Sequence, residues 1–282
     1  MQFLDILKII LYGIVEGVTE WLPVSSTGHL ILFDKFLPLR FSSAFQDMFE
    51  YVIQLSAIFA VVILFWKKIF PLEKTENGLK WKKESLSLWG KVLVACIPAL
   101  LAFVVDKLFL SGLDTITESL TIACALIVYG AVFLWVEKKN ENKTPKVSDV
   151  RELSYKTAFF IGCFQLLAVI PGTSRSGITI IGALLLLVSR ATASEFTFLL
   201  AIPTMVGASG YKILDFIMEG NTLASTEILA LVIGCVVAFA VSMLVIKFLM
   251  NFVKKHDFKI FGWYRIALGV VVLATLVLPA FL

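Results

Sequence analysis

The sequence predicts an all-α polytopic membrane protein with six transmembrane helices plus two re-entrant helical hairpins in an inverted repeat. Of its 282 residues, 59% are hydrophobic and only 16% are charged, whereas soluble domains carry about 25% charged residues. The mean hydropathy is +0.91. Long apolar runs recur along the chain, and polar, proline-containing stretches interrupt two of its hydrophobic regions. The net charge of +4 is divided among loops, which argues against a nucleic-acid partner.

Six apolar runs reach or approach the roughly 20 residues that a helix needs to cross a bilayer. They are apolar on nearly every face and longer than the ~10-residue alternating strands of a membrane barrel, so we expect helices. We place the spans near residues 47–66, 90–110, 116–136, 195–213, 227–250 and 263–282. The amino terminus carries Asp5 and lacks a small-residue cleavage pattern, so we expect it to be retained and not removed as a signal peptide.

The charges of the loops predict the side of the membrane on which each loop lies. The basic loops are residues 67–83, 138–156 and 254–259. Two other loops, residues 111–118 and 214–227, contain Asp and Glu but neither Lys nor Arg. The positive-inside rule places the basic loops in the cytoplasm. With six spans, this assignment puts the carboxyl terminus outside.

Two hydrophobic regions, residues 6–38 and 157–190, remain and are predicted to be re-entrant hairpins. The second must begin and end in the cytoplasm to keep the basic loops on one side, and the first is assigned by its resemblance to the second. Each is broken at a proline, Pro23 in WLPVSSTGH and Pro171 in VIPGTSRSG, because proline removes a helix donor. Irregular backbone at membrane depth is tolerated only beside protein or water, so both breaks are candidate site loops.

A weak internal repeat relates the two hairpins. Aligning Gly13 with Gly162 also aligns Gly28 with Gly177 without a gap. The same alignment places Glu16 on Gln165, Ser25 on Ser174, Ser26 on Arg175 and Thr27 on Ser176. We therefore expect a single integral membrane domain over residues 1–282, with pseudo-repeat halves of about 1–140 and 150–282. Inverted repeats of this kind bring broken helices together near the bilayer midplane.

The polar residues of the two breaks are candidate halves of one phosphate site. Glu16 and Glu20 lie one helical turn apart, and their like charges repel unless a proton or a cation lies between them. A helix that starts after each break presents free N–H groups to an anion, and Arg175 supplies a planar fork for phosphate oxygens. The expected phosphate-binding residues are Ser25, Thr27, Ser174, Ser176, Gly177 and Thr179.

Ser26 and His29 are the candidates for the chemical step, because a hydroxyl near an imidazole is the minimal unit for nucleophilic attack. Ser26 attacks phosphorus with His29 as base, or His29 attacks directly, or one of them orients water; the sequence leaves all three open. The structural alternatives are also open. A lone membrane histidine often only joins two helices, either glutamate could be a counter-ion to Arg175, and the hydroxyl residues are equally suited to cap helices.

The motifs EGVTEWLPVSSTGH and PGTSRSGIT resemble those of the bacterial undecaprenyl pyrophosphate phosphatase family, the bacitracin-resistance type. The resemblance extends across nearly the whole chain. It implies hydrolysis of undecaprenyl diphosphate to undecaprenyl phosphate and inorganic phosphate, which recycles the carrier lipid for cell-wall synthesis and confers bacitracin resistance. The catalytic residues that it implies are Glu16, Glu20, Ser26, His29 and Arg175. It also implies support by Mg²⁺ or Ca²⁺, with Glu16 and Glu20 as the candidate ligands.

The resemblance further implies a multi-pass protein of the bacterial plasma (inner) membrane whose active site faces the outer, periplasmic side. The expected partners are an isoprenyl diphosphate lipid and the lipid bilayer, with no nucleic acid and with a homodimer left open. A secondary transporter or lipid flippase is the alternative, since it would use the same inverted repeat. A phosphatase with two catalytic histidines fits less well, because His256 lies in a predicted cytoplasmic loop.

Overall fold

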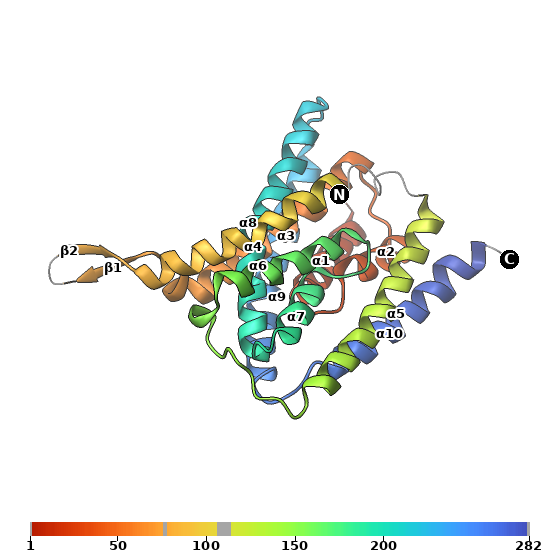
Figure 1. Cartoon of the computed structure of the whole chain (residues 1–282). Coiled ribbons are helices and arrows are strands. Elements are labelled where there is room, and N and C mark those ends of the chain that lie inside the picture. The colour runs from red at the N-terminus through yellow and green to blue at the C-terminus, as the bar shows by residue number, and fades with distance from the viewer. Residues whose placement is uncertain (1, 76–77, 106–113, 281–282) are drawn as a thin grey trace.

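The computed structural model describes residues 2–75, 78–105 and 114–280, and most of these residues are helical (Figure 1). The α-helices are α1 (Phe3–Thr19), α2 (Ser26–Phe36), α3 (Ser43–Ile69), α4 (Lys83–Val105), α5 (Thr115–Asn140), α6 (Tyr155–Phe164), α7 (Arg175–Leu185), α8 (Arg190–Met218), α9 (Ser225–Phe252) and α10 (Lys259–Val272). Shorter turns are η2 (Val150–Glu152), η3 (Gln165–Val169), η4 (Leu273–Val277) and η5 (Leu278–Ala280).

Six helical segments are long and apolar enough to cross a membrane, which confirms the predicted polytopic all-α class. They are α3, α4, α5, α8, α9 and the stretch Lys259–Ala280 that begins with α10. Each overlaps one predicted span. The predicted ends at residues 106–110 and 281–282 lie outside the described residues.

Each predicted hairpin consists of two short helical pieces separated by an irregular break. The first break, residues 20–25, separates α1 from α2, and the second break, residues 170–174, separates η3 from α7. Both breaks end in a serine with positive φ, 76° at Ser25 and 68° at Ser174. Each serine caps the next helix by accepting a hydrogen bond from a backbone N–H, that of Gly28 or that of Gly177. The two breaks therefore share one local geometry, whereas their entry from opposite membrane faces stays a prediction.

The helices pack in a reciprocal pattern. α1 packs along α9, and α6, which the alignment pairs with α1, packs along α4. α3 packs with α8, and α5 runs beside α10 at the lower right of Figure 1. A two-fold repeat would produce these pairings, although the division into two halves stays a prediction.

Glycines allow several of these helices to touch at their backbones. A Cβ at Gly17 of α1 would lie 2.8 Å from the carbonyl oxygen of Ala238 in α9, and one at Gly162 of α6 would collide with the carbonyl oxygen of Ala95 in α4. Membrane helices rely on such small residues, because lipid removes the hydrophobic drive that joins helices in water. The close approach fixes α1 and α6, the helices that lead into the two breaks.

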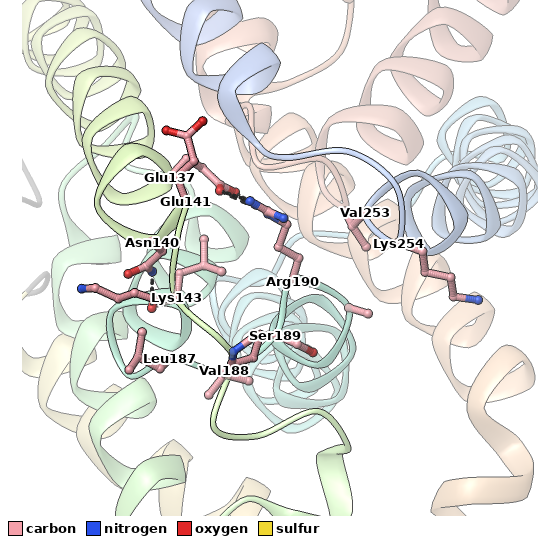
Figure 2. Close-up of a pocket in the computed structure, with 13 residues that line it drawn as sticks. Glu137, Asn140, Glu141, Lys143, Leu187, Val188, Ser189, Arg190, Val253 and Lys254 are labelled. Atoms are coloured by element: carbon pink, nitrogen blue, oxygen red, sulfur yellow. Dashed lines mark hydrogen bonds and ion pairs between the residues drawn. The ribbon is translucent and has the colours of Figure 1, made fainter.

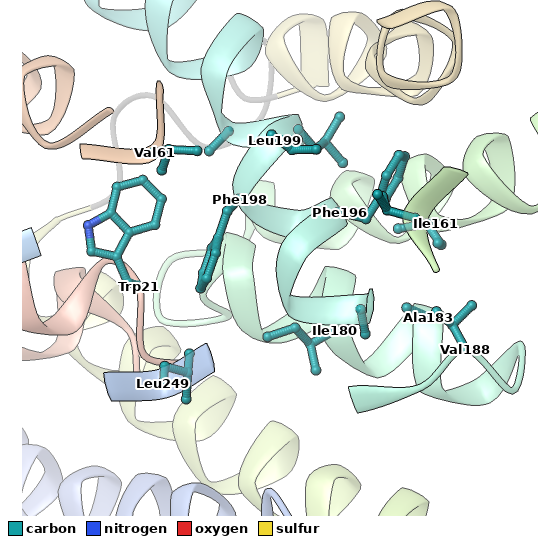
Figure 3. Close-up of a cluster of buried hydrophobic side chains, with 14 of the residues drawn as sticks. Trp21, Val61, Ile161, Ile180, Ala183, Val188, Phe196, Phe198, Leu199 and Leu249 are labelled. Carbon is teal, nitrogen blue, oxygen red and sulfur yellow. The ribbon is translucent and has the colours of Figure 1, made fainter. Parts of the chain in front are cut away.

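The largest buried apolar cluster surrounds α8 and holds the first break in place (Figure 3). Trp21 is fully buried, and its ring meets that of Phe198 edge-on with the centroids 5.3 Å apart. Figure 3 shows Trp21 and Phe198 lying between Val61 and Leu249. Because Trp21 directly follows Glu20, the packing of this indole fixes the direction of the first break.

The basic loop at residues 67–83 contains an antiparallel hairpin that the sequence does not predict. Its strands are β1 (Leu72–Thr75) and β2 (Gly78–Trp81), with Leu72 paired to Trp81. The hairpin extends from the ends of α3 and α4 at the left of Figure 1, away from both breaks. The charges of this loop predicted its side of the membrane, but four-residue strands are too short to give a clear alternating pattern.

Candidate active site

The two breaks meet at the wall of a cavity of about 740 Å³. The first break and the start of α2 contribute Glu20, Ser26 and Thr27, and the second break and the start of α7 contribute Ser174 and Arg175. The rest of the wall includes Tyr51, Gln54, Cys96, Leu100, Glu118, Gln165, Pro203 and Tyr211. The cavity therefore combines a polar end, where the breaks meet, with a more apolar wall formed by membrane helices.

Glu20 joins the two breaks. Its Oε1 accepts a hydrogen bond from Arg175 Nη2 at 2.9 Å, and its Oε2 accepts one from Ser26 Oγ at 3.1 Å. The side chains of Arg175 and Glu20 are only 16% and 10% exposed. Ser176 adds a second link, because its hydroxyl donates to the Glu20 carbonyl oxygen at 3.1 Å. Of the predicted catalytic residues, Glu20, Ser26 and Arg175 thus come together.

Contacts with α8 hold Arg175 at the start of α7. Its Nη1 donates to the Thr197 carbonyl oxygen at 3.3 Å, and its Nη2 lies 3.6 Å from the sulfur of Met205. Thr179 is fully buried one turn farther along, where its hydroxyl lies 2.9 Å from the Arg175 carbonyl oxygen and 3.0 Å from Thr197 Oγ1. Thr179 therefore supports α7 from behind and is not among the described residues that line the cavity.

Glu16 lies one turn before Glu20, as its spacing predicts, but it is enclosed by the protein. It is fully buried, and neither of its carboxylate oxygens has a hydrogen-bond partner among the described residues. A buried carboxylate without partners is costly, so Glu16 requires a proton or a cation. Within the described ranges, no group of three or more His, Cys, Asp or Glu side chains is placed to hold a metal ion.

His29 points toward α10. Its Nδ1 lies 2.7 Å from the Ser25 carbonyl oxygen, and its Nε2 lies 2.7 Å from the Tyr264 hydroxyl. A carbonyl oxygen can only accept, so Nδ1 carries the hydrogen, and Nε2 of the neutral ring accepts from Tyr264. The two rings are stacked with centroids 5.6 Å apart. His29 is not among the described residues that line the cavity, whereas Ser26 is.

The remaining predicted phosphate-binding residues divide between the cavity and structural roles. Thr27 is exposed and lines the cavity. Ser174 lines it as well while capping α7 through the N–H of Gly177 at 3.1 Å. Ser25 and Ser176 are buried, so they act as a helix cap and as a link between the breaks.

Two adjacent residues of α10, Tyr264 and Arg265, belong to the site although they were not among the predicted site residues. Tyr264 holds His29, and Arg265 is fully buried with its guanidinium donating to the carbonyl oxygens of Pro23, Gly172 and Thr173. A buried arginine in a membrane span is a strong functional signal. In the sequence that signal is hidden, because Arg265 lies at the start of the last predicted span and just after a basic loop.

A second cavity, of about 390 Å³, lies at the opposite ends of α5 and α8 (Figure 2). Figure 2 shows Arg190 extending toward Glu137, which it binds through Nε at 2.9 Å and Nη2 at 2.5 Å. The backbone N–H of Phe258 also donates to Glu137, at 2.9 Å. These bonds join the ends of α5, α8 and α10, and none of the predicted site residues is among the described residues lining this cavity.

Comparison with known proteins identifies the family. The family profile described as "Bacitracin resistance protein BacA" matches residues 9–271. A protein of Enterococcus faecalis named undecaprenyl-diphosphatase is 54% identical over 275 residues, covering 97% of this chain and 98% of that protein. Proteins of the same name from Lachnoclostridium phytofermentans and Desulfitobacterium hafniense are 53% and 52% identical, and each alignment covers at least 96% of both chains. These matches confirm the resemblance, and the chain belongs to the bacitracin resistance protein BacA family.

Proposed function

We propose that this protein hydrolyses undecaprenyl diphosphate to undecaprenyl phosphate and inorganic phosphate, and so recycles a carrier lipid for cell-wall synthesis and confers bacitracin resistance. The observation that carries the proposal is the convergence of Arg175 and Ser26 on Glu20 at the wall of one cavity. Full-length similarity to proteins named undecaprenyl-diphosphatase supports the choice of lipid. A polar site among membrane helices suits a substrate with a charged head and a hydrocarbon tail.

The polar end of the cavity can bind a diphosphate. α2 and α7 both begin there, and the first turn of each helix offers free N–H groups and a positive dipole end to an anion. Arg175 adds a fork that can hold two phosphate oxygens at once. Because this fork now binds Glu20, an entering phosphate would compete for Arg175 and leave the Glu20 carboxylate free to accept a proton.

Ser26 is the proposed nucleophile, with Glu20 as its base. The Ser26 hydroxyl already donates to Glu20, as expected of an activated nucleophile. Ser26 Oγ forms a bond to the terminal phosphorus, its proton passes to Glu20, and the bond from that phosphorus to the bridging oxygen breaks. Undecaprenyl phosphate then leaves and Glu20 releases the proton. Water attacks the phosphoserine, Glu20 accepts a proton from that water, and Ser26 recovers a hydrogen as inorganic phosphate departs.

His29 is the alternative nucleophile, and the chemistry of a trapped intermediate separates the two. Because both of its ring nitrogens have other partners, we assign His29 to positioning the start of α2. Rapid acid quenching of enzyme with ³²P-labelled substrate should trap an acid-stable phosphoserine that Ser26→Ala abolishes. In a parallel quench with detergent at alkaline pH, which preserves phosphohistidine, an acid-labile label that persists in Ser26→Ala would assign the attack to His29.

A divalent cation, Mg²⁺ or Ca²⁺, is part of the proposal. Glu16 and Glu20 offer hard oxygen ligands, and both Glu16 oxygens lack partners among the described residues. Two carboxylates are too few for a complete protein cage, so the ion would need further oxygen ligands. The ion would neutralise phosphate charge. Chelation should lower phosphate release, and added Mg²⁺ or Ca²⁺ should restore it; release unaffected by exhaustive chelation would contradict this part.

We place the cavity on the outer, periplasmic side of a bacterial inner membrane. Tyr51 near the start of α3, Glu118 in the first turn of α5 and Tyr211 near the end of α8 all line it. The segment that joins α8 to α9, taken with the adjoining helix ends as residues 214–227, contains no Lys or Arg, and the basic loops join the opposite helix ends. The positive-inside rule therefore supports this orientation.

Phosphate release from an isoprenyl diphosphate by the purified protein tests the proposed function. Arg175→Ala and Glu20→Ala should each abolish release. Arg151→Ala is the matched control, because Arg151 is also ion-paired, to Asp149 and Glu84, but lies in an exposed loop. Near-wild-type turnover in both site variants would contradict the proposal.

Lipid translocation is the second candidate function, and the reciprocal packing of α1 with α9 and α6 with α4 favours it. Reconstituted liposomes distinguish the two activities. Translocation of labelled lipid without phosphate release would assign the protein to transport, whereas phosphate release without translocation would assign it to hydrolysis.

A further inference from the structure

We infer that Arg265 of α10 is a positioning residue that binds the two breaks to each other directly behind the phosphate site. Its Nη1 donates to the Pro23 carbonyl oxygen at 3.3 Å, in the first break. Its Nη2 donates to the carbonyl oxygens of Gly172 and Thr173, each at 2.9 Å, in the second break. One guanidinium thus spans both breaks. The catalytic consequence rests on the proposed function, whereas the structural link does not.

These carbonyl oxygens need a donor because the helices are interrupted there. Pro23, Gly172 and Thr173 are all buried, and their backbone lies outside helical hydrogen bonding. A buried carbonyl oxygen without a partner costs about 1–3 kcal/mol. The guanidinium group suits the position, because its donors lie in a planar fork that reaches acceptors on two sides. An ammonium group is compact and cannot reproduce this fork.

Arg265 also brings a positive charge that is not ion-paired with any carboxylate of the described residues. None of the ion pairs formed by the described residues includes Arg265. It lies behind the first turn of α7, where a Cβ at Gly177 would be 3.3 Å from Arg265 Nη1. Arg265 is not among the described residues that line the cavity, so it acts through the breaks and through its field. Its charge adds to that of Arg175 and to the positive ends of α2 and α7, which favours a polyanion.

The close packing of α10 on α5 fixes the position of Arg265. A Cβ at Gly262 would lie 2.9 Å from the Gly130 carbonyl oxygen, and one at Gly269 would lie 2.9 Å from the Ala123 carbonyl oxygen, so α10 touches the backbone of α5 on both sides of Arg265. The neighbouring Tyr264 binds His29. A short segment of α10 therefore positions the first break, the second break and the start of α2 together.

Hydrogen exchange tests the structural link without any assay of activity. In full-length Arg265→Gln protein, amides of residues 20–28 and 170–177 should exchange at least about fivefold faster, because both breaks lose a charge-assisted partner. Amides of α9 should keep their wild-type rates. Arg190→Lys is the control, since it alters another partly buried arginine, paired with Glu137 at the far ends of α5 and α8, and should leave both breaks unchanged. Unaltered exchange at both breaks in Arg265→Gln would overturn the inference.

Kinetics test the catalytic consequence. Arg265→Lys keeps a charge but loses the fork, so kcat per folded molecule should fall about tenfold or more with KM nearly constant. Arg265→Gln also loses the charge, so KM should rise in addition. If Arg265→Gln does not fold, Arg265→Lys decides the question. A wild-type kcat with only a lower Tm in Arg265→Lys would show that Arg265 merely stabilises the fold, and it would overturn the inference. Wild-type protein that releases no phosphate would contradict the proposed function, while the exchange result would still decide the link.

Discussion

Glu20 is a single side chain on which both halves of the site depend. It accepts hydrogen bonds from Arg175 of α7 and Ser26 of α2 at the same time. The Glu20 carboxylate is largely buried, so it depends on the nearby Arg175 guanidinium to compensate its charge. Competition between Glu20 and a phosphate for Arg175 would therefore couple substrate binding to the release of a base.

Tyr264 offers a test of how His29 is held. Tyr264→Phe removes the hydroxyl at 2.7 Å from His29 Nε2 but keeps the stacked ring. A typical hydrogen bond contributes about 0.5–1.5 kcal/mol, so turnover should fall about two- to tenfold. The rate of phosphate release across a range of pH checks this, because freeing Nε2 should also shift the pH profile. A profile and a rate identical to those of wild type would show that the hydroxyl does not position His29.

The chemistry of the side chains identifies the residues of this site in the sequence, but it does not show which way each side chain points. Glu20, Ser26 and Arg175 stand out because ionisable and hydroxyl groups are costly inside apolar segments, and they do converge. Spacing also placed Glu16 and His29 correctly along their helices, yet it could not show that Glu16 is enclosed or that His29 faces Tyr264. The direction of His29 depends on a contact with α10, and the enclosure of Glu16 depends on the packing of α1 on α9; both partner helices lie far away in the sequence.

Each break combines a helix cap with a strained backbone. Ser25 and Ser174 cap α2 and α7 with φ values of 76° and 68°. Residues other than glycine rarely adopt positive φ, at a cost of about 1–3 kcal/mol. The strain is held at the point where each new helix turns its amino end toward the cavity.

Variants of Ser174 separate the cap from the strain. Ser174→Ala loses the hydroxyl that accepts from Gly177 N–H and keeps the strained φ, so it should lower the free energy of unfolding by about 0.5–2 kcal/mol. Ser174→Gly also loses the hydroxyl but relieves the strain, so its loss should be clearly smaller. Thermal unfolding of the purified variants compares the two. Equal losses in both would mean that the positive φ at Ser174 carries no strain.

The close backbone contact between α6 and α4 leaves no room for a larger residue at Gly162. Gly162→Ala places a methyl group against the Ala95 carbonyl, so α6 must move and the variant should lose about 1–3 kcal/mol of stability. Turnover should fall as well, because α6 leads into the second break. Gly210→Ala in α8 is the control, since nothing lies within 4 Å of its added Cβ. Equal melting temperatures for the two variants would contradict the close packing.

The six spans were predictable because length and apolarity alone define a membrane-crossing helix. The ends of the spans were harder to predict. α3 begins at Ser43, before the predicted start at residue 47, and ends at Ile69, after the predicted end at residue 66. Polar residues such as Gln46 and Lys67 continue the helix outside the apolar run, where hydropathy gives no signal. The strands β1 and β2 escaped prediction because four residues are too few to give a clear alternating pattern.

The two cavities of the molecule lie at opposite ends of α5 and α8. Glu118 lines the larger cavity and Glu137 the smaller, and both belong to α5 (Figure 1 shows its length). The Glu137–Arg190 pair joins helix ends beside the basic loops. A head group entering the larger cavity would therefore approach from the side that the loop charges assign to the exterior.

Cysteine labelling in intact cells tests this orientation. The native cysteines to be replaced first are Cys96, Cys124, Cys163 and Cys235. In that background, a membrane-impermeant maleimide should label Thr222→Cys, which lies after α8, and should not label Lys143→Cys, which lies in a basic loop; both positions are exposed. Permeabilised cells provide the control, in which both should react. The reverse pattern in intact cells would place the larger cavity in the cytoplasm.

The contact between α1 and α9 has a consequence for how the protein is made. Gly13 and Gly17 of α1 rest on the backbone of α9 at Gly234 and Ala238, and the buried Glu16 lies between those two glycines. α9 leaves the ribosome long after α1, so for most of synthesis the glycine face of α1 has no partner and its carboxylate has no enclosure. The packing that encloses Glu16 can therefore form only after α9 has been made, so it is a late step in the assembly of this protein.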